Sequence, residues 1–343
     1  MSLLITILVS ILVFGGVIFI HEFGHFATAK LCGIKVNEFA LGMGPTVFHF
    51  TRGETTYALR LLPIGGFVSM EGEDEESADE HSFTRAPVYK RILVVVAGAV
   101  MNLVLGFVVL LILVSQQSAI TSRTVSQFSE NASTQASGLA LGDEIIAVNG
   151  RRCFIADDIV YEFMRTQNGT ADLTVLRDGK KVELPQVKFE TKKQSDGSSG
   201  LVIDFKVLPL EKTPLNVLRE GGLWTASLSR MIFLSLIDLV SGRVAVNNLS
   251  GPVGIVTVIS EAVSVGWQPI LMILAMITIN LGIFNLIPFP ALDGGKLILL
   301  IIEGIRRRPL AQKYEIAINL GGFAVLMLLM VFVTYNDIAR LIH

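Results

Sequence analysis

Four long apolar stretches constrain what this chain can fold into. They run from Leu3 to Ile20 and on towards Leu31, from Ile92 to Val114, from Ile270 to Ile302 with interruptions by proline and glycine, and from Ile316 to Val333. Each is long enough to cross a hydrocarbon core, which takes about 20 apolar residues. Only 17% of the residues are charged, against about 25% in soluble domains. The sequence therefore predicts a polytopic α-helical membrane protein with about four transmembrane helices.

Two alternatives concern the number of spans. Leu223–Val240 is a fifth apolar stretch, but it contains Arg230, Asp238 and several serines. We read it as an amphipathic helix that lies in the membrane interface or packs against protein. The first stretch could be a signal peptide, but it has neither a positively charged start nor an A-x-A cleavage site. We therefore expect it to remain as a span.

Lysine and arginine predict the orientation. The loop after the first span is basic, the loop between the third and fourth spans contains Arg306–Arg308, and the N-terminal end has no basic residue. Basic loops face the cytoplasm. With four spans, both loops lie inside, and the N-terminus, the 116–268 segment and the C-terminus lie outside. A fifth span would put Arg306–Arg308 on the opposite side from the first basic loop, so this distribution favours four.

A polar segment, 119–208, separates the second and third spans. Its strand-like runs Asp143–Val148 and Ala171–Leu176 precede the turn pairs Asn149-Gly150 and Asp178-Gly179. The segment is long enough for one small β-rich domain. We therefore divide the chain into an N-terminal membrane part (1–118), this domain (119–208), an amphipathic helical connector (209–267) and a C-terminal membrane part (268–343). Cys32 and Cys153 fall on opposite sides of the membrane and cannot pair.

The first span contains an H-E-x-x-H motif, His21-Glu22-Phe23-Gly24-His25. Residues four apart share one face of a helix, so both imidazoles can bind one metal ion. Zinc fits, because it takes imidazole ligands and needs no redox chemistry. Glu22 can reach a water held by the metal and accept its proton. Ionisable residues inside an apolar helix are costly, which makes a functional role more plausible than coincidence.

The third span supplies a candidate for a third ligand. Two prolines and two glycines interrupt it over Asn285–Gly295, and its first carboxylate is Asp293. Broken backbone at membrane depth is tolerated where protein or a water-filled cavity surrounds it. Asp293 could also be the N-cap of the helix that follows. Asn102 and Asn285 are candidates for contact with a substrate backbone, whereas Asn280 could equally form a hydrogen bond between helices.

These residues carry a family resemblance. The pairing of His21–His25 with Asn285–Gly295 resembles the site-2 protease family of intramembrane zinc metalloproteases, and most of all its bacterial RseP/RasP-like branch. Further matching stretches are Gly33–Val36, Gly42–Pro45, Leu62–Val68 and Leu249–Gly254. Gly98–Asn102 matches the family's Gly-Pro-x-x-Asn pattern, except that Ala99 replaces the proline, which leaves the local helix geometry open. Ala136–Gly150 resembles a stretch of PDZ domains, and the sequence fits a single PDZ domain where some relatives have two.

The resemblance implies one catalytic zinc ion, with His21, His25 and Asp293 as ligands and Glu22 as general base. It implies that the substrate-binding residues are Asn102, Asn285, Gly65 and Gly66. The two glycines belong to Tyr57–Met70, which by itself reads as a cytoplasmic hairpin and in the family resembles a membrane-entering β-loop beside the active site. The implied fold is a helical membrane protein with this membrane-associated β-hairpin and one inserted extracytoplasmic PDZ-like domain. The acidic run Glu71–Glu80 is expected to be a solvated loop.

The implied function is cleavage of single-span membrane proteins within the bilayer of the bacterial cell membrane. Anti-sigma-factor-like proteins or remnant signal peptides are the expected substrates, after another protease has trimmed them. The PDZ-like domain could bind a peptide by strand addition or act as a steric filter. The alternative is a catalytically inactive PDZ-bearing receptor or scaffold. A metal transporter would need a relay of ionisable residues, which the spans lack, and the net charge of −2 gives no basic footprint for nucleic acid.

Overall fold

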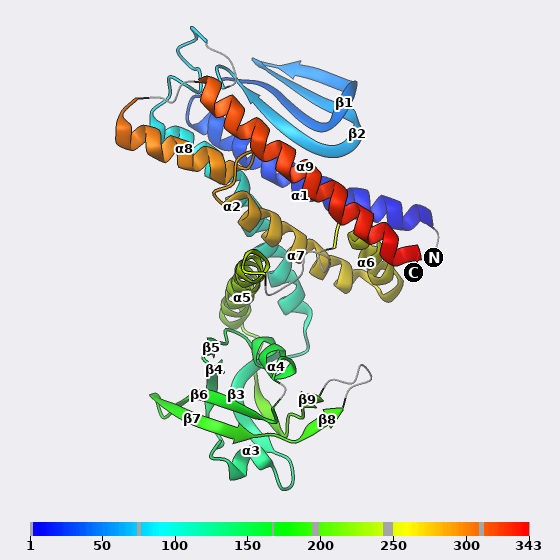
Figure 1. The fold of residues 1–343 in the computed structure, drawn as a ribbon, viewed down its shortest axis with the longest axis vertical. Coiled ribbons are helices and arrows are strands. Elements are labelled where there is room, and N and C mark those ends of the chain that lie inside the picture. The colour runs from blue at the N-terminus through cyan, green and yellow to red at the C-terminus, as the bar shows by residue number, and fades with distance from the viewer. Residues whose placement is uncertain are drawn as a thin grey trace. The chain divides into compact units, whose positions relative to one another are not determined.

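The computed structural model describes residues 3–73, 77–166, 168–193, 199–242, 250–308 and 312–342. The chain forms two compact units, the first from Met1–Val109 with Met231–His343 and the second from Leu110–Arg230 (Figure 1). Asp74, Glu75 and Glu76 of the acidic run, and Leu249 of the Leu249–Gly254 stretch, lie outside the described residues.

Long apolar helices make up most of the first unit. The first, second and fourth predicted spans lie in α1 (Leu3–Leu31), α2 (Val88–Gln116) and α9 (Gln312–Ile342). The third is divided into α7 (Trp267–Asn285) and α8 (Asp293–Arg306), and α6 (Pro252–Val265) precedes it. The division falls at the two prolines, because proline cannot continue a helical hydrogen-bond ladder. The expected interruption of this span is therefore present.

The stretch predicted as an interfacial helix lies in α5 (Pro214–Val240). Within the described residues, five helices are long and apolar enough to cross a membrane, and α5 is one of them. Length and composition alone therefore admit a fifth span. The arrangement with four spans stays a prediction.

Glycines allow α1, α2 and α7 to approach one another closely. A Cβ atom at Gly24 of α1 would lie 2.5 Å from the Ala97 carbonyl oxygen of α2, and one at Gly282 of α7 would lie 2.9 Å from that of Ala99. Thr278 of α7 donates a hydrogen bond of 3.1 Å to the carbonyl oxygen of Asn102. Small residues and interhelical hydrogen bonds of this kind hold helices together in lipid. As a result, α2 packs closely against both of the other helices.

A β-sheet follows α1, and its bounds correct the sequence prediction. Strand β1 (Val36–Arg52) pairs antiparallel with β2 (Thr55–Met70), and the turn between them contains Gly53 with a φ of +65°. Tyr57–Met70 is thus part of one long strand and not a hairpin. Its Gly65, with a φ of +78°, forms a bend. After this bend the strand returns along β1, so that Leu41 pairs with both Leu59 and Gly66.

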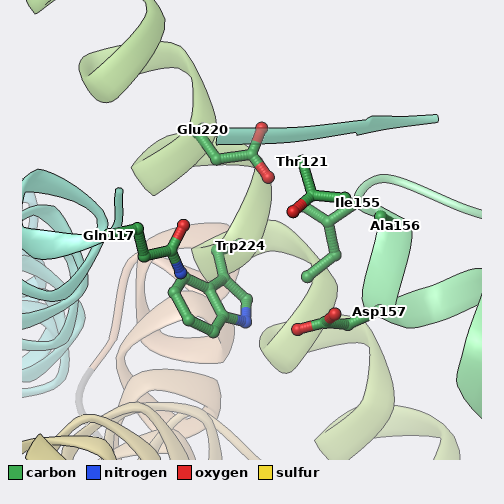
Figure 2. Close-up of a pocket in the computed structure, with 7 residues that line it drawn as sticks. All are labelled: Gln117, Thr121, Ile155, Ala156, Asp157, Glu220 and Trp224. Atoms are coloured by element: carbon green, nitrogen blue, oxygen red, sulfur yellow. The ribbon is translucent and has the colours of Figure 1, made fainter. Parts of the chain in front are cut away.

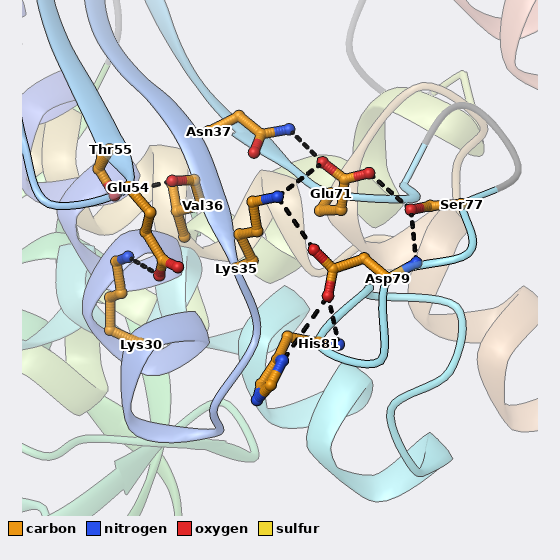
Figure 3. A network of polar contacts seen from close by, with 10 residues as sticks. All are labelled: Lys30, Lys35, Val36, Asn37, Glu54, Thr55, Glu71, Ser77, Asp79 and His81. Atoms are coloured by element: carbon orange, nitrogen blue, oxygen red, sulfur yellow. Dashed lines mark hydrogen bonds and ion pairs between the residues drawn. The ribbon is translucent and has the colours of Figure 1, made fainter.

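Polar contacts fasten the segment after β2 to the start of β1 (Figure 3). Lys35 donates a 2.9 Å hydrogen bond to Asp79 and lies 3.7 Å from Glu71. Glu71 also accepts hydrogen bonds from Asn37 and Ser77, at 2.9 and 2.6 Å. These bonds lower the pKa of the Glu71 carboxyl below its ordinary value. The described acidic residues Glu71 and Asp79 are therefore structural partners of Lys35.

The second unit is built on a twisted sheet with strand order β10-β3-β4-β6-β7, and β5 pairs with β4. The strands are β3 (Ile120–Phe128), β4 (Glu144–Val148), β5 (Arg151–Arg152), β6 (Thr170–Arg177), β7 (Lys180–Lys188) and β10 (Phe205–Leu210), and a small pair is formed by β8 (Thr191–Lys193) and β9 (Ser199–Leu201). The helices are α3 (Ser133–Ala136) and α4 (Ala156–Met164). The predicted strands and both predicted turns are present, and Asn149 and Asp178 have positive φ as such turns require. Cys153 is buried in this unit and Cys32 lies in the first, and both are free.

The first half of α5 packs on the second unit. Ser227 donates a hydrogen bond to the Asp158 carboxylate, and Arg230 Nη2 lies 3.6 Å from the same group. Asp158 and Ser227 are both buried. Figure 2 shows Trp224 of α5 beside Gln117, in a small pocket that Ile155 and Asp157 also line. This half of α5 therefore belongs to the polar domain's own structure.

Candidate metal centre

The two histidines of the H-E-x-x-H motif lie one turn apart on α1. Their ring centroids are 4.8 Å apart and the rings are nearly perpendicular, at 86°. This brings the two Nε2 atoms to 3.2 Å from each other. Both side chains are largely shielded, with 11% and 12% of their surface exposed. The pair therefore presents two nitrogen donors to one point.

Asp293 reaches the same point from α8, of which it is the first residue. The chain makes a tight turn over 286–292 before it, with Ala291 in the left-handed region at φ +71°. A Cβ atom at Gly294 would overlap the carbonyl oxygen of Ile287, and one at Gly295 that of Phe289. The Gly-Gly pair thus lets the turn fold back onto the start of α8. This close packing fixes where Asp293 lies.

The three donor atoms have the spacing of a tetrahedral metal site. Asp293 Oδ2 lies 3.3 Å from His21 Nε2 and 3.4 Å from His25 Nε2. Zinc bonds of about 2.0 Å to nitrogen and oxygen place two tetrahedral ligand atoms about 3.3 Å apart. Asp293 Oδ2 is also buried and accepts no hydrogen bond from the described residues. The donor set therefore fits one zinc ion, and a buried anionic oxygen would gain the most from it.

Helix α2 contacts the Nδ1 atoms of both imidazoles, on the side of each ring away from the Nε2 donor. His25 Nδ1 lies 2.8 Å from the Val94 carbonyl oxygen, and His21 Nδ1 lies 3.2 Å from Asn102 Nδ2. Between these two contacts, a Cβ atom at Gly98 would overlap His25 Nε2 and lie 2.8 Å from His21 Cε1. Gly98 and Val94 were not among the predicted site residues. The spacing of Val94, Gly98 and Asn102, four residues each, could have indicated a shared helix face.

Strand β2 passes beside Glu22. A Cβ atom at Gly66 would lie 3.0 Å from Glu22 Cγ and 3.1 Å from Ile18 Cγ2. Gly66 therefore brings the strand against the half-buried carboxylate, whereas Gly65 packs against Met43 within the sheet. Asn285 is buried as the last residue of α7. Among the described residues, neither Asn285 nor Gly65 makes a hydrogen bond or ion pair with the two histidines or Asp293.

One face of α8 fastens Asp293 to the rest of the unit. Lys296 pairs with Glu73 and lies 4.8 Å from the ring centroid of Phe83. Further along, Glu303 accepts hydrogen bonds of 3.0 and 2.5 Å from both terminal nitrogens of Arg91 on α2. The helix that carries the candidate ligand is thus held at two further points.

Comparison with known proteins agrees with this geometry. The model of the family described as Peptidase family M50 matches residues 9–329. A Clostridium perfringens protein named as a zinc metalloprotease is 36% identical over 335 residues, which cover 97% of this chain and 98% of that protein. The regulator of sigma-W protease RasP of Bacillus subtilis is 32% identical over 421 aligned positions, which cover 98% and 99%. The zinc metalloprotease RasP of Shouchella clausii is 31% identical over 416 positions, which cover 98% and 99%.

Proposed function

The chain belongs to peptidase family M50 and is a zinc metalloprotease, and from this we propose that it cuts single-span membrane proteins within the bilayer. The observation that carries the proposal is the triangle of His21, His25 and Asp293 donor atoms, with edges of 3.2, 3.3 and 3.4 Å. We assign these three residues as ligands of one zinc ion. The helix that carries both histidines, α1, is long and apolar enough to cross a membrane, so the bond that is cut would lie at membrane depth.

Glu22 acts as the general base in this proposal. When bound, zinc supplies a Lewis acid that polarises the scissile carbonyl and makes an attacking water acidic. The Glu22 carboxylate accepts the proton of that water and then returns it to the leaving amine. Its place next to the histidines on α1, with Gly66 against its Cγ atom, keeps it beside any peptide that lies along β2. The Val94 carbonyl oxygen accepts a hydrogen bond from His25 Nδ1 and fixes that ring.

Substrate binding by strand addition is the role we propose for β2. A transmembrane helix hides its amides, so it must be extended before it can be cut. Gly66–Met70 pairs with β1 along one edge, and the described residues leave its other edge unpaired. An extended peptide added there would be held by main-chain hydrogen bonds. Gly66 would then set its distance from Glu22, and Asn102 and Asn285 remain candidates for contacts with its backbone.

Apolar side chains at the far end of the sheet support its contact with lipid. Seven of them are about half exposed or more: Met43, Val47, Phe48, Phe50, Leu59, Leu61 and Leu62. Exposed apolar side chains gathered on one small sheet mark an interaction site. We propose that it enters the inner leaflet, with the basic loops in the cytoplasm and the termini and second unit outside. The cell membrane of a bacterium is the proposed location.

The substrates are inferred from the relatives. RasP of Bacillus subtilis is named a regulator of sigma-W, and we propose anti-sigma-factor-like proteins or remnant signal peptides as substrates of this chain, after another protease has trimmed them. The alignment with RasP extends over 421 positions although this chain has 343 residues, so RasP contains stretches that this chain lacks. This difference supports a single PDZ-like domain here. The domain would bind a peptide or exclude bulky ectodomains.

Replacing Glu22 by glutamine tests the proposal. The Glu22→Gln variant keeps the three zinc ligands, so it should bind zinc as the wild type does and fail to cut a single-span reporter in reconstituted vesicles. Continued cleavage by this variant would refute the assignment. The alternative, an inactive membrane receptor, predicts a purified wild-type protein with close to no zinc and no cleavage. Comparing membranes that contain either form would then identify substrates as single-span fragments that accumulate.

A further inference from the structure

The protonation of the two imidazoles is linked to the partners of their second nitrogens. An imidazole that binds a cation through Nε2 carries its proton on Nδ1, so Nδ1 needs a hydrogen-bond acceptor. His25 has one, because the Val94 carbonyl oxygen lies 2.8 Å from its Nδ1. His21 has only the Asn102 side chain, whose Nδ2 lies 3.2 Å from its Nδ1. Two N–H donors cannot bond to each other, so this arrangement suits His21 protonated on Nε2, the form that cannot bind metal.

The oxygen of the same amide has no partner. Asn102 is 0% exposed, and its Oδ1 accepts no hydrogen bond from the described residues. A buried acceptor left without a donor is unfavourable. A half-turn of the amide group exchanges its oxygen and nitrogen and leaves the rest of the side chain in place. After this turn, Oδ1 accepts the proton of His21 Nδ1, and His21 presents a free Nε2 towards Asp293.

The packing around Asn102 makes it a rigid partner. Its carbonyl oxygen accepts the hydrogen bond from Thr278 of α7. One turn earlier, the close contact of Gly282 with the Ala99 carbonyl oxygen keeps α7 against α2. The side chain is therefore held in place, and rotation of the amide about its last bond is the freedom that remains.

We propose that Asn102 is a positioning residue that selects the metal-binding tautomer of His21 by accepting a hydrogen bond from Nδ1. This assignment rests on the proposed zinc protease function and deepens it. It gives both imidazoles the same support, an oxygen acceptor from α2, supplied by a backbone carbonyl for His25 and by an amide for His21. It differs from a role for Asn102 in contacting substrate, because its first effect is on metal affinity.

The test measures zinc affinity by competition with a chromophoric chelator. Asn102→Leu removes the acceptor, and we expect zinc binding about 10- to 100-fold weaker, as for other residues that orient metal ligands. Asn102→Asp keeps an acceptor and should bind zinc within a few-fold of the wild type. Thr278→Val removes the neighbouring α2–α7 hydrogen bond without touching the amide. It measures what this packing contributes, and it should weaken zinc binding less than Asn102→Leu does. Visible absorption of the cobalt-substituted forms should change for Asn102→Leu and stay like the wild type for Asn102→Asp.

Three results would overturn this role. Wild-type zinc affinity in Asn102→Leu would mean that His21 needs no acceptor, and a raised KM with intact zinc would place Asn102 on the substrate instead. Equal loss of zinc in the aspartate and leucine variants would mean that Asn102 acts as a donor. If Asn102→Leu fails to fold, Asn102→Ala, which also removes the acceptor, takes its place in these measurements. Absence of zinc from the wild type would refute the proposed function itself, which is a separate result.

Discussion

At the scale of single residues, Gly98 sets the tightest limit on the centre. Its missing side chain leaves room for both imidazoles, since a Cβ atom there would overlap His25 Nε2. We expect Gly98→Ala to displace the rings, lower zinc content and reduce cleavage at least 100-fold. Alanine favours helices over glycine by about 1 kcal/mol, so the helix itself should not weaken. Gly321→Ala on α9, where nothing lies within 4 Å of the new carbon, is the control, and full zinc and activity in Gly98→Ala would contradict this role.

Residues also differ in how far sequence could predict them. His21 and His25 could be predicted to share a face because the helical period fixes it. Asp293 could be predicted as a candidate because two prolines break the helix just before it and two glycines follow it directly. The role of Val94 could not be predicted from the sequence. Every residue has a backbone carbonyl, and which carbonyl accepts a hydrogen bond from His25 depends on which helix lies alongside α1. The role of Gly98 depends on the same contact between α1 and α2. The sequence therefore predicts the donors, and the packing of the helices supplies what holds them.

At the scale of elements, α8 is held by charges along one face. Asp293, Lys296, Leu300 and Glu303 recur at helical spacing, and the last pairs with Arg91 in a largely buried, two-nitrogen contact. Removing one partner leaves a buried charge unpaired, which costs about 3–5 kcal/mol. We expect Arg91→Met and Glu303→Met each to lower the thermal stability of the zinc-free protein, and the double variant to lose less than the sum. Additive losses in thermal unfolding would show that the pair is not coupled.

The β-sheet shows where patterns of sequence mislead. Gly65-Gly66 resembles the closing turn of a hairpin, but the turn is formed at Gly53 and the glycine pair bends a strand. Both sites need a positive φ, so glycine alone does not distinguish a turn from a bend. The sequence pattern also gives no role to the Leu249–Gly254 stretch. In its described part, the N–H groups of Gly251 and Gly254 donate to the buried Asp337 carboxylate of α9 at 3.1 and 2.8 Å, which joins the start of α6 to α9.

At the scale of the whole molecule, the predicted topology depends on whether α5 crosses the membrane. Its residues up to Arg230 belong to the second unit, where Ser227 and Arg230 bind Asp158. Only Met231–Val240 remains, which is about half of the 20 residues that a span requires. We therefore expect cysteines placed at Ser241 and Arg306 to be labelled from opposite sides, 241 from outside and 306 from the cytoplasm. Labelling of 241 from the cytoplasm and 306 from outside would establish a fifth span.

Each of the two units has its own hydrophobic core. We therefore expect acid to destabilise the second unit independently of the first. Asp143 is fully buried there and accepts hydrogen bonds of 2.7 Å from Nε and Nη2 of Arg177 and 2.8 Å from the Ala140 N–H. Burial alone would raise the pKa of the Asp143 carboxyl, but these bonds hold its pKa below the ordinary value. The ionised form is thus favoured in the folded state, so its stabilisation is complete above about pH 4 and is lost as pH falls through the lowered pKa.

Trp224 can report this transition, because it lies in the second unit and the other tryptophan, Trp267, lies in the first. In a Trp267→Phe background, we expect Trp224 fluorescence to change below about pH 4 at a moderate urea concentration. Asp143→Asn should unfold at lower urea at pH 7 and lose most of the pH dependence, because it cannot form the charged pair with Arg177. An equal pH dependence in both proteins would mean that other carboxylates control the acid stability of this unit.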